Sequence, residues 1–306
     1  PTLTLSSANA LTAAQVASNL KLDFNAIQLD NDLTLASGKT LTLISQSGVA
    51  QAAGKALNVS KLLLSGSGAI TLGGANQVGT LASDSTAAVS LGLGGGDLVI
   101  GTVGSTSGLR NASSIAISGA RSISVNAGVS ATGAVSLAGG VGLSTGASAN
   151  GIVIGSAAQV SSLTGNVLLD AGMAGNFINN RGADVVTAGG RWTVWSYGVA
   201  NNQFGSDGTA ASMLSSGNGT YWNQTWSGGY SVNSNPISAI TGNRYVFAQS
   251  APVAGTGDLV IYTTSANKTY GTALTPSDLL SPTYTQLSGP ISSAALYDKR
   301  GTINLI

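Results

Sequence analysis

The stretch IAISGARSISVNAGVSATGAVSL, residues 115–137, decides the fold. Its units IAI (115–117), ISV (123–125) and VSL (135–137) each place apolar residues on both sides of a small central residue. Residues two positions apart share one face of a β-strand, so each unit predicts a short strand with one buried face. Gly, Asn or Ala-Gly follows each unit within a few residues and turns the chain. The stretch therefore predicts short strands joined by brief turns.

The same pattern extends over much of the chain. Ten further units repeat it: LTL (33–35), LTL (41–43), LNV (57–59), LLL (62–64), ITL (70–72), VSL (89–91), LVI (98–100), VGL (141–143), IVI (152–154) and VLL (167–169). The strands are shorter than those of a β-sandwich, and several begin about eight residues apart, which favours a β-solenoid. We expect coils of about 20 to 25 residues with three strands each, so that residues 30–176 form about six or seven coils.

The composition agrees with a solenoid and excludes several classes of function. Charged residues make up 8% of the 306 residues, and the chain has neither cysteine nor histidine. The net charge of +1 and the scattered basic residues predict no binding of nucleic acid. No apolar run reaches the ~18 residues of a membrane span, so we expect no membrane insertion. The chain begins at Pro1 without an initiator Met, which we interpret as a piece of a longer protein or a processed product.

The N-terminal segment follows a different pattern. In NALTAAQVASNL, Ala13, Val16, Ala17 and Leu20 recur at helical spacing, and Asn9 is placed to cap the N-terminus of a helix. One interpretation is a short helix that covers an open end of the solenoid. The other is an additional irregular coil, and the sequence does not decide between them.

Aromatic residues are concentrated after residue 176, and the one aromatic residue before Phe177 is Phe24. Three segments contain most of them: RWTVWSY (191–197), TYWNQTW (220–226) and NRYVFA (243–248). In the first, Trp192 and Val194 are predicted to face one way, and Thr193, Trp195 and Tyr197 the other. Bulk on both faces predicts a strand that is covered on both sides or that exposes one aromatic face.

Three ranges of the chain resemble filamentous-haemagglutinin-like exoproteins of two-partner secretion systems. GNVLLDAGMAGNFINNRGADVVTAGGRWTVWSYGVANNQFG (165–205) resembles the closing part of their β-helix, and TGNRYVFAQSAP (241–252) resembles the strand that follows a gap. LVIYTTSANKTYGTALTPSDLL (259–280) is similar to the start of an MBG domain, whose KTYG signature matches Lys268, Thr269, Tyr270 and Gly271. Residues 1–164 agree with this family by repeat style only.

The resemblance implies an all-β protein with a right-handed parallel β-helix followed by a small β-sandwich-like MBG module. We divide the chain into a shaft (1–176), an aromatic-rich closing part (177–252) and an MBG-like module (253–306) that is shorter than the family's usual one. The family implies secretion to the surface or extracellular matrix of a Gram-negative bacterium, with roles as adhesins or in biofilms. It also implies an outer-membrane transporter as partner, which would recognise a secretion domain that is not identifiable here.

Two functions compete on this basis. The first is a surface adhesin or matrix fibre that binds polysaccharide or a neighbouring cell. The second is the protomer of a self-assembling filament joined by β-strand complementation, because uncovered sheet edges recruit strands. The apolar segment Ile303, Asn304, Leu305 and Ile306 is then the candidate for strand donation.

Aromatic side chains are the candidates for direct ligand contact. Trp and Tyr rings stack on sugars, so one hypothesis is a carbohydrate platform made of Trp192, Trp195, Tyr197, Trp222 and Trp226. The competing hypothesis, which we favour, is structural: these rings close the narrow bore of the solenoid and join it to the next module.

Catalysis and metal binding have little support in the sequence. A polysaccharide-active β-helix enzyme needs clustered acids, often with Arg, Lys or His, and here His, Cys and Glu are missing. The acid pair Asp30 and Asp32 could flank a ligand or Ca²⁺, but two solvated turn aspartates are the favoured interpretation. GLGGGDLVI (92–100) departs from the calcium-binding nonapeptide at Leu93 and has no tandem copy, which favours a solenoid corner. We predict no catalytic residue, no metal and no cofactor.

Overall fold

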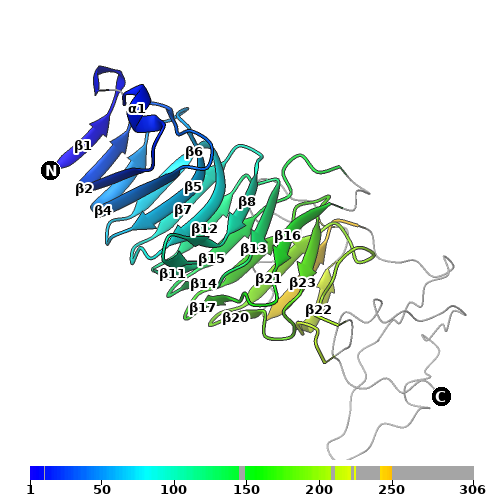
Figure 1. Ribbon diagram of the computed structural model, residues 1–306. Helices are drawn as coiled ribbons and strands as arrows, with labels where there is room; N and C mark the ends of the chain where they lie inside the picture. Colours follow the sequence, from blue (N-terminus) through cyan, green and yellow to red (C-terminus); the bar gives the residue numbers. More distant parts are fainter. Residues whose placement is uncertain (10, 145–148, 208–210, 222–223, 225–241, 250–306) are drawn as a thin grey trace, which may run out of the picture.

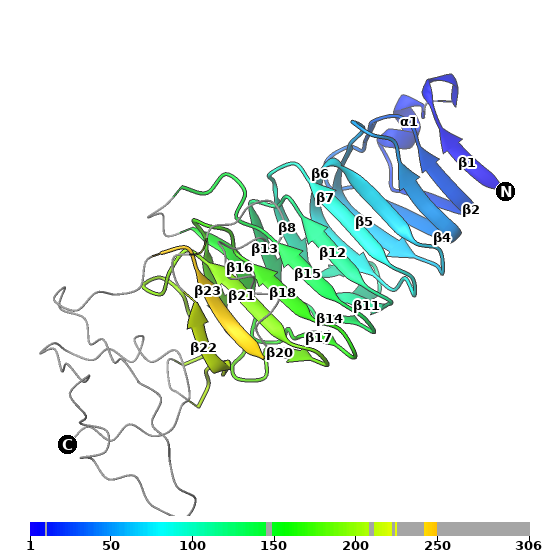
Figure 2. The same cartoon turned by 180° about the vertical axis from the view of Figure 1, so that it is seen from behind.

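The computed structural model describes residues 1–9, 11–144, 149–207, 211–221, 224 and 242–249. These residues form an elongated stack of coils that begins at β1 (Thr2–Leu5) and ends at β22 (Gly217–Tyr221) and β23 (Asn243–Phe247) (Figures 1 and 2). The all-β prediction is confirmed, and a long parallel sheet is wound through the stack as in a solenoid. The predicted MBG-like module lies outside the described residues.

The strands of successive coils align into three ladders, which we call faces A, B and C. Face A contains, in spatial order, β1, β2 (Leu20–Leu29), β4 (Thr40–Gln51), β6 (Ile70–Ser83), β7 (Val89–Leu93), β12 (Ile115–Ser118), β15 (Val135–Ala138), β18 (Val167–Asp170), β21 (Trp192–Ser196), β23 and β22. Face B contains β3 (Leu33–Thr34), β5 (Leu57–Ser65), β6, β8 (Asp97–Ile100), β13 (Ser122–Val125), β16 (Asn150–Ile154) and β19 (Asn176–Asn179). Face C contains β2, β4, β5, β6, β11 (Leu109–Ala112), β14 (Val129–Ala131), β17 (Val160–Ser162) and β20 (Val186–Ala188).

Early coils differ from later ones in how the strands meet the corners. β2, β4, β5 and β6 are long and continue around a corner: β2, β4 and β5 each contribute to two faces, and β6 contributes to all three. From β7 onward, most coils use separate strands of three to five residues. An antiparallel hairpin, β9 (Thr102–Val103) and β10 (Thr106–Ser107), is inserted between faces B and C and contacts β6.

The interior of the stack is filled by aliphatic side chains in register. On face A one inward row runs through Leu72, Leu91, Ile117, Leu137, Leu169 and Val194, all of them buried. Each position repeats one coil later because parallel pairing places like positions about 4.8 Å apart. Burial of each such side chain contributes roughly 1.5–3 kcal/mol relative to exposure. The stacked rows therefore supply the main stabilisation of the solenoid.

Twelve of the thirteen predicted units overlap strands. The exception is VGL (141–143), which lies in a turn between β15 and β16, with Val141 49% exposed. Here a longer excursion of the chain carries an apolar alternation away from the ladder. Conversely, β14, β17 and β20 have no unit in the prediction, because their inward positions include Ala and Ser and the alternation is weak.

The corners depend on glycine and asparagine. Gly66 has a φ of 108°, and a Cβ there would lie 2.0 Å from the carbonyl oxygen of Ser45, so only glycine fits. Asn76 is fully buried, and its Oδ1 accepts a hydrogen bond of 2.7 Å from the backbone N–H of Leu57. Side-chain amides of this kind satisfy backbone groups where the ladder is interrupted.

The N-terminal end contains a helix at the predicted position, shortened to about one turn. The 3₁₀ helix η1 (Ser7–Asn9) precedes the four-residue helix α1 (Ala13–Val16). The predicted cap, Asn9, is wrong: Thr12 is the N-cap and forms a capping box with Gln15, whereas Asn9 accepts from the backbone of Ser6. Of the helical positions, Val16 packs against the core, so α1 covers only a small part of this end.

The last strands of face A lie in reversed order. Thr193 of β21 pairs with Arg244 of β23, and Tyr245 of β23 pairs with Thr220 of β22. β23 is therefore inserted between β21 and β22, although β22 comes first in the sequence (Figure 2). Earlier strands of face A follow the sequence order throughout.

Candidate functional site

Trp192 and Trp195 lie on opposite sides of strand β21. Trp192 and Val194 point into the interior, and Trp195 belongs to a separate cluster on the outside of face A. The predicted alternation of these residues is thus confirmed. Each ring is only 3% exposed. Both sides of this strand are covered, which is one of the two outcomes predicted from its bulk.

An inner aromatic cluster fills the bore at the last coil. Trp192 and Phe204 each pack edge-on against Tyr245, at ring-centroid distances of 5.1 and 4.8 Å. Phe247 stacks parallel to Tyr245, and the Tyr245 hydroxyl donates a 2.7 Å hydrogen bond to the carbonyl of Leu214. This arrangement agrees with the hypothesis that aromatic residues close the solenoid.

A second group, which we call the outer cluster, lies on the opposite side of the same strands. It consists of Leu168 on β18, Trp195 on β21 and Val246 on β23, all buried, with half-buried Tyr221 of β22 against them. The register explains the grouping, because Trp195 pairs with Val246 and Val246 with Tyr221. The outer cluster is a small hydrophobic layer on the outside of the solenoid.

Two ionisable residues flank the outer cluster. Asp170 pairs in register with Trp195 and accepts a 2.8 Å hydrogen bond from the backbone N–H of Gly172. Burial raises the pKa of Asp170 from 3.8 to about 6, against the opposing effect of that hydrogen bond. Arg244 is also buried, lies 5.8 Å from the ring centroid of Tyr221 and donates to the carbonyl of Gly242. Burial lowers the pKa of Arg244, and neighbouring Arg191 adds to this effect.

The remaining predicted site residues are placed as follows. Tyr197 follows β21, is half-buried, and its backbone N–H donates to the carbonyl of Gly175. Trp222 and Trp226 lie outside the described residues, as do Ile303, Asn304, Leu305 and Ile306. The carbohydrate platform stays a prediction, and the structure places Trp192 and Trp195 on opposite sides of one sheet.

Sequence reasoning missed the partners that surround these tryptophans. From the sequence alone, Leu168 is assigned to an ordinary strand and Asp170 has no role, and Tyr245 and Phe247 lie in a resemblance motif without a role. The alternation in NRYVFA already indicates one face with Tyr245 and Phe247 and another with Arg244 and Val246. What the sequence lacks is the register, which joins residues about fifty positions apart.

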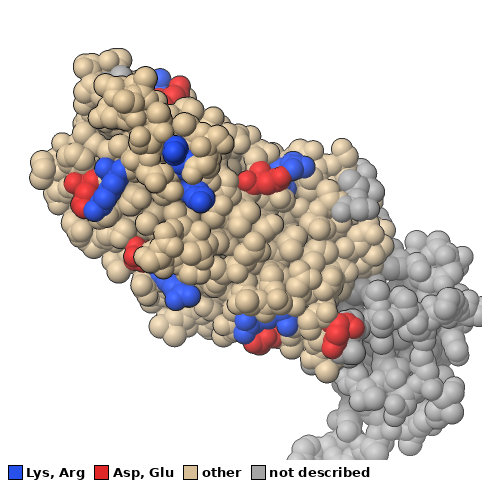
Figure 3. Space-filling view, in the orientation of Figure 1, with Lys and Arg blue, Asp and Glu red and all other residues tan. Residues whose placement is uncertain are grey.

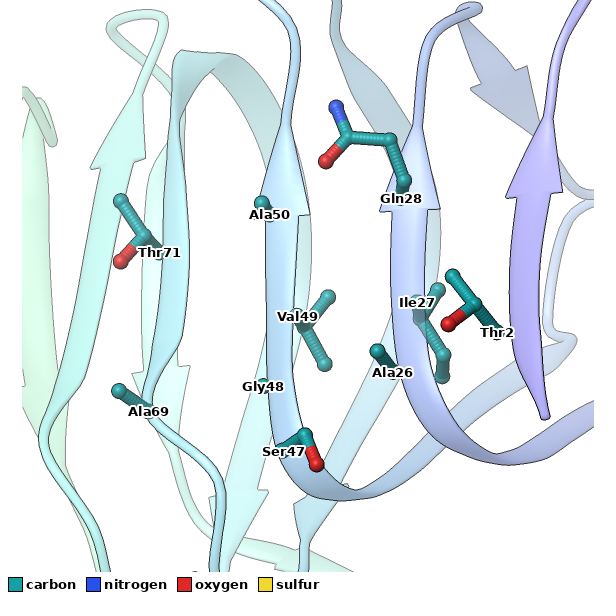
Figure 4. A pocket seen from close by; sticks show the side chains of 10 residues that line it. All are labelled: Thr2, Ala26, Ile27, Gln28, Ser47, Gly48, Val49, Ala50, Ala69 and Thr71. Atoms are coloured by element: carbon teal, nitrogen blue, oxygen red, sulfur yellow. The ribbon is translucent and has the colours of Figure 1, made fainter.

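The N-terminal half of face A has a different surface. Thr2, Gln28, Ala50 and Thr71 project outward from β1, β2, β4 and β6 (Figure 4). With Gly48 and Ala69 they line a shallow groove of about 290 Å³. The side chains are small or uncharged, so the groove offers hydroxyl and amide groups on a flat support.

Charged groups elsewhere are scattered over the surface (Figure 3). Arg121 forms an ion pair with Asp97, which also accepts a 2.8 Å hydrogen bond from Ser122. Asp30 accepts from Gln28, and Asp32 accepts from the backbone of Ala56, as expected of aspartates in a turn. Among the described residues no three His, Cys, Asp or Glu side chains gather in a way that could hold a metal ion.

Comparisons of the chain with protein families, with curated proteins and with solved structures give no match. Within the described part of the chain, no helix has both the length and the apolar character needed to span a bilayer.

Proposed function

We propose that this chain is part of a non-enzymatic bacterial surface protein in which a right-handed parallel β-helix forms a rigid stalk. The stalk mediates attachment to polysaccharide, to surfaces or to neighbouring cells, as an adhesin or an extracellular-matrix fibre. The protein reaches the outside of a Gram-negative cell through a two-partner transporter and carries an MBG-like module at residues 253–306. The resemblance of residues 165–205 and 241–280 supports this assignment.

One observation carries the proposal: the long stack of coils has an interior filled with apolar side chains. The hydrophobic core continues without a break from Leu5 on β1 to Phe247 on β23. Close-packed interiors have low compressibility, and every coil is bonded to the next through backbone ladders. Such a solid rod suits a protein that spaces or presents other groups at a distance.

Attachment is tested with the purified chain immobilised on beads. We expect the beads to adhere to bacterial cells or to at least one of a panel of bacterial polysaccharides, and beads with the heat-unfolded chain to lose this adhesion. Binding that survives substitution of both Trp192 and Trp195 in a folded variant would rule out the carbohydrate platform. Absence of adhesion, together with release of sugar fragments, would favour the polysaccharide-active enzyme instead.

Electron microscopy separates the stalk from the filament protomer. Single rods of uniform length are expected for a stalk, whereas end-to-end polymers indicate self-assembly. If polymers form and persist after deletion of residues 300–306, strand donation by Ile303 to Ile306 is excluded.

A further inference from the structure

The hairpin of β9 and β10 is an insertion at the corner between faces B and C. Leu81 of β6 pairs with Ile100 of β8. Two positions later, Ser83 of β6 pairs with Leu109 of β11. A single residue separates the two pairs on β6, whereas residues 101–108 separate them in the next coil. The hairpin therefore occupies the place that one residue fills in the coil before it.

The neck of the hairpin is part of the regular ladder. Gly108 donates its backbone N–H to the carbonyl of Gly101, at 2.8 Å. The N–H of Gly101 donates to the carbonyl of Leu81, and the carbonyl of Gly108 accepts from the N–H of Ser83. Because the ladder continues through the neck, it does not by itself fix the position of the hairpin's tip. Other contacts must do so.

The tip folds back toward the N-terminal coils. β9 contacts both β5 and β6, and β10 contacts β6. Along the ladder β5 pairs with β6, and β6 pairs with β8 and β11, so β5 lies two strands away from the coil that carries the hairpin. Stacked repeats of a solenoid ordinarily contact only their immediate neighbours. The hairpin thus links three successive coils.

An apolar patch on the outside of face C lies at the position of these contacts. Leu63 of β5 pairs with Ala82 of β6, and both point outward because the residues before them on their strands belong to the core. Ala82 is 0% exposed and Leu63 is half-buried, whereas Lys21, in the same outward row, is exposed. Val103, the buried residue of β9, is 2% exposed although it lies outside the bore. The hairpin and this patch therefore form an apolar contact on the outer surface.

We propose that the β9–β10 hairpin is a clasp, which holds the coil of β8 to the two preceding coils and makes the three unfold together. Burial of Val103 supplies the attraction. A 3.0 Å hydrogen bond from the Thr102 hydroxyl to the Ser107 hydroxyl joins the two arms of the hairpin. The clasp lies where the strands change character, because β6 continues around its corners and most later coils use short, separate strands.

The absence of native cysteine allows the docking to be tested by thiol labelling of the full chain. We expect Ala82→Cys to react slowly with a maleimide, and the added substitution Val103→Asp to accelerate it about tenfold or more. Leu81→Cys, which lies in the bore, should react slowly in both backgrounds. Thr102→Asp, on the exposed side of β9, is the matched control and should leave the labelling of Ala82→Cys unchanged. Fast labelling of Ala82→Cys in the parent background, or equal rates with the two aspartates, overturns the proposal.

The coupling of the coils is tested by labelling during urea denaturation. Leu62→Cys reports on β5, and Ile123→Cys reports on β13, which pairs with β8. We expect the two urea midpoints to coincide in the parent background and to differ by about 0.5 M or more with Val103→Asp. Separate midpoints in the parent background, or coincident midpoints with Val103→Asp, overturn the clasp.

A milder substitution covers the case in which Val103→Asp unfolds the solenoid and Leu81→Cys also reacts fast. Val103→Thr keeps the shape of the side chain and places a hydroxyl in the buried contact. We expect it to accelerate Ala82→Cys about threefold or more without changing Leu81→Cys. An unchanged rate for Ala82→Cys in this variant overturns the proposal.

Discussion

The two halves of face A share one register but carry different surfaces. A single outward row runs through Thr71, Ser90, Ala116 and Ser136 and continues through Leu168, Thr193 and Arg244. The first four side chains are small and at least partly exposed, whereas the last three are buried. Pairing register decides only whether a side chain points inward or outward. Whether an outward residue is small and exposed or bulky and buried depends on what lies outside the sheet.

The interior changes at the same place. The inward row holds Leu137 and Leu169 in the shaft and Tyr245 on β23. Aliphatic residues fill the narrow bore where another coil follows on each side. Within the described residues, the coil that contains β23 is the last of the stack, and there larger rings fill the interior and pack on one another. In the described part of the chain, both changes begin near β21.

The largest expected effect concerns this inner closure. Tyr245→Ala removes a fully buried ring that contacts Trp192 and Phe204 and also removes the hydrogen bond to Leu214. Truncation of a buried aromatic residue costs about 3–5 kcal/mol, and the lost hydrogen bond about 1 kcal/mol. We expect a loss of about 5 kcal/mol in the free energy of unfolding, measured by urea denaturation.

Tyr245→Phe is the matched control, because it keeps the ring and removes only the hydroxyl. We expect it to cost about 1 kcal/mol. If Tyr245→Ala lowers the free energy of unfolding no more than Tyr245→Phe does, the ring does not close the bore. The difference between the shaft and the last coil then contributes nothing to stability.

The second prediction tests directly whether the outward positions in the two halves of face A differ in exposure. Thr71 and Thr193 occupy the same outward row, but Thr71 is exposed and Thr193 is 8% exposed and pairs with Arg244. Thr193→Lys places a further positive charge beside the buried guanidinium of Arg244, which we expect to cost about 4 kcal/mol. Thr71→Lys is expected to change the free energy of unfolding by less than about 0.5 kcal/mol. Equal effects of the two lysines in urea denaturation would show that the C-terminal half of face A is not covered.

Much of the fold follows from the sequence because the solenoid repeats a local pattern. Alternation in units such as ISV and VSL predicted strands, and the spacing predicted coils of three strands. The prediction of a strand at VGL (141–143) was wrong, because alternation alone does not show whether a segment joins the ladder. Face C strands such as β17 were missed because Ala and Ser at inward positions leave little hydrophobic signal.

The candidate site could be predicted only in part. Alternation within RWTVWSY assigned Trp192 and Trp195 to opposite sides, and the structure agrees. The partners Leu168 and Val246 depend on pairing between distant strands, and the reversed order of β22 and β23 has no local signature. The sequence alone predicts that Trp195 points outward, but it does not show that residues of other strands surround Trp195.

The third prediction uses pH to test the burial of Asp170, which lies in the C-terminal half of face A. The folded-state pKa of Asp170 is raised to about 6, above its ordinary 3.8, because burial disfavours the carboxylate. Between these two values the folded protein binds more protons than the unfolded chain, so the free energy of unfolding falls as pH rises from about 4 to 6. The penalty above pH 6 is about 3 kcal/mol, since one pKa unit corresponds to about 1.4 kcal/mol.

Asp170→Asn should therefore match the parent protein below pH 4 and exceed it by about 3 kcal/mol at pH 7, because the amide oxygen still accepts from Gly172. Urea denaturation across this pH range measures the difference. Asp97→Asn supplies a control of opposite sign: burial raises the pKa of Asp97, but hydrogen bonds from Ser122 and Arg121 outweigh it and lower the pKa. That variant should lose stability at neutral pH. If Asp170→Asn leaves the pH profile unchanged, Asp170 is hydrated, and the outer cluster is then uncovered at its edge on β18.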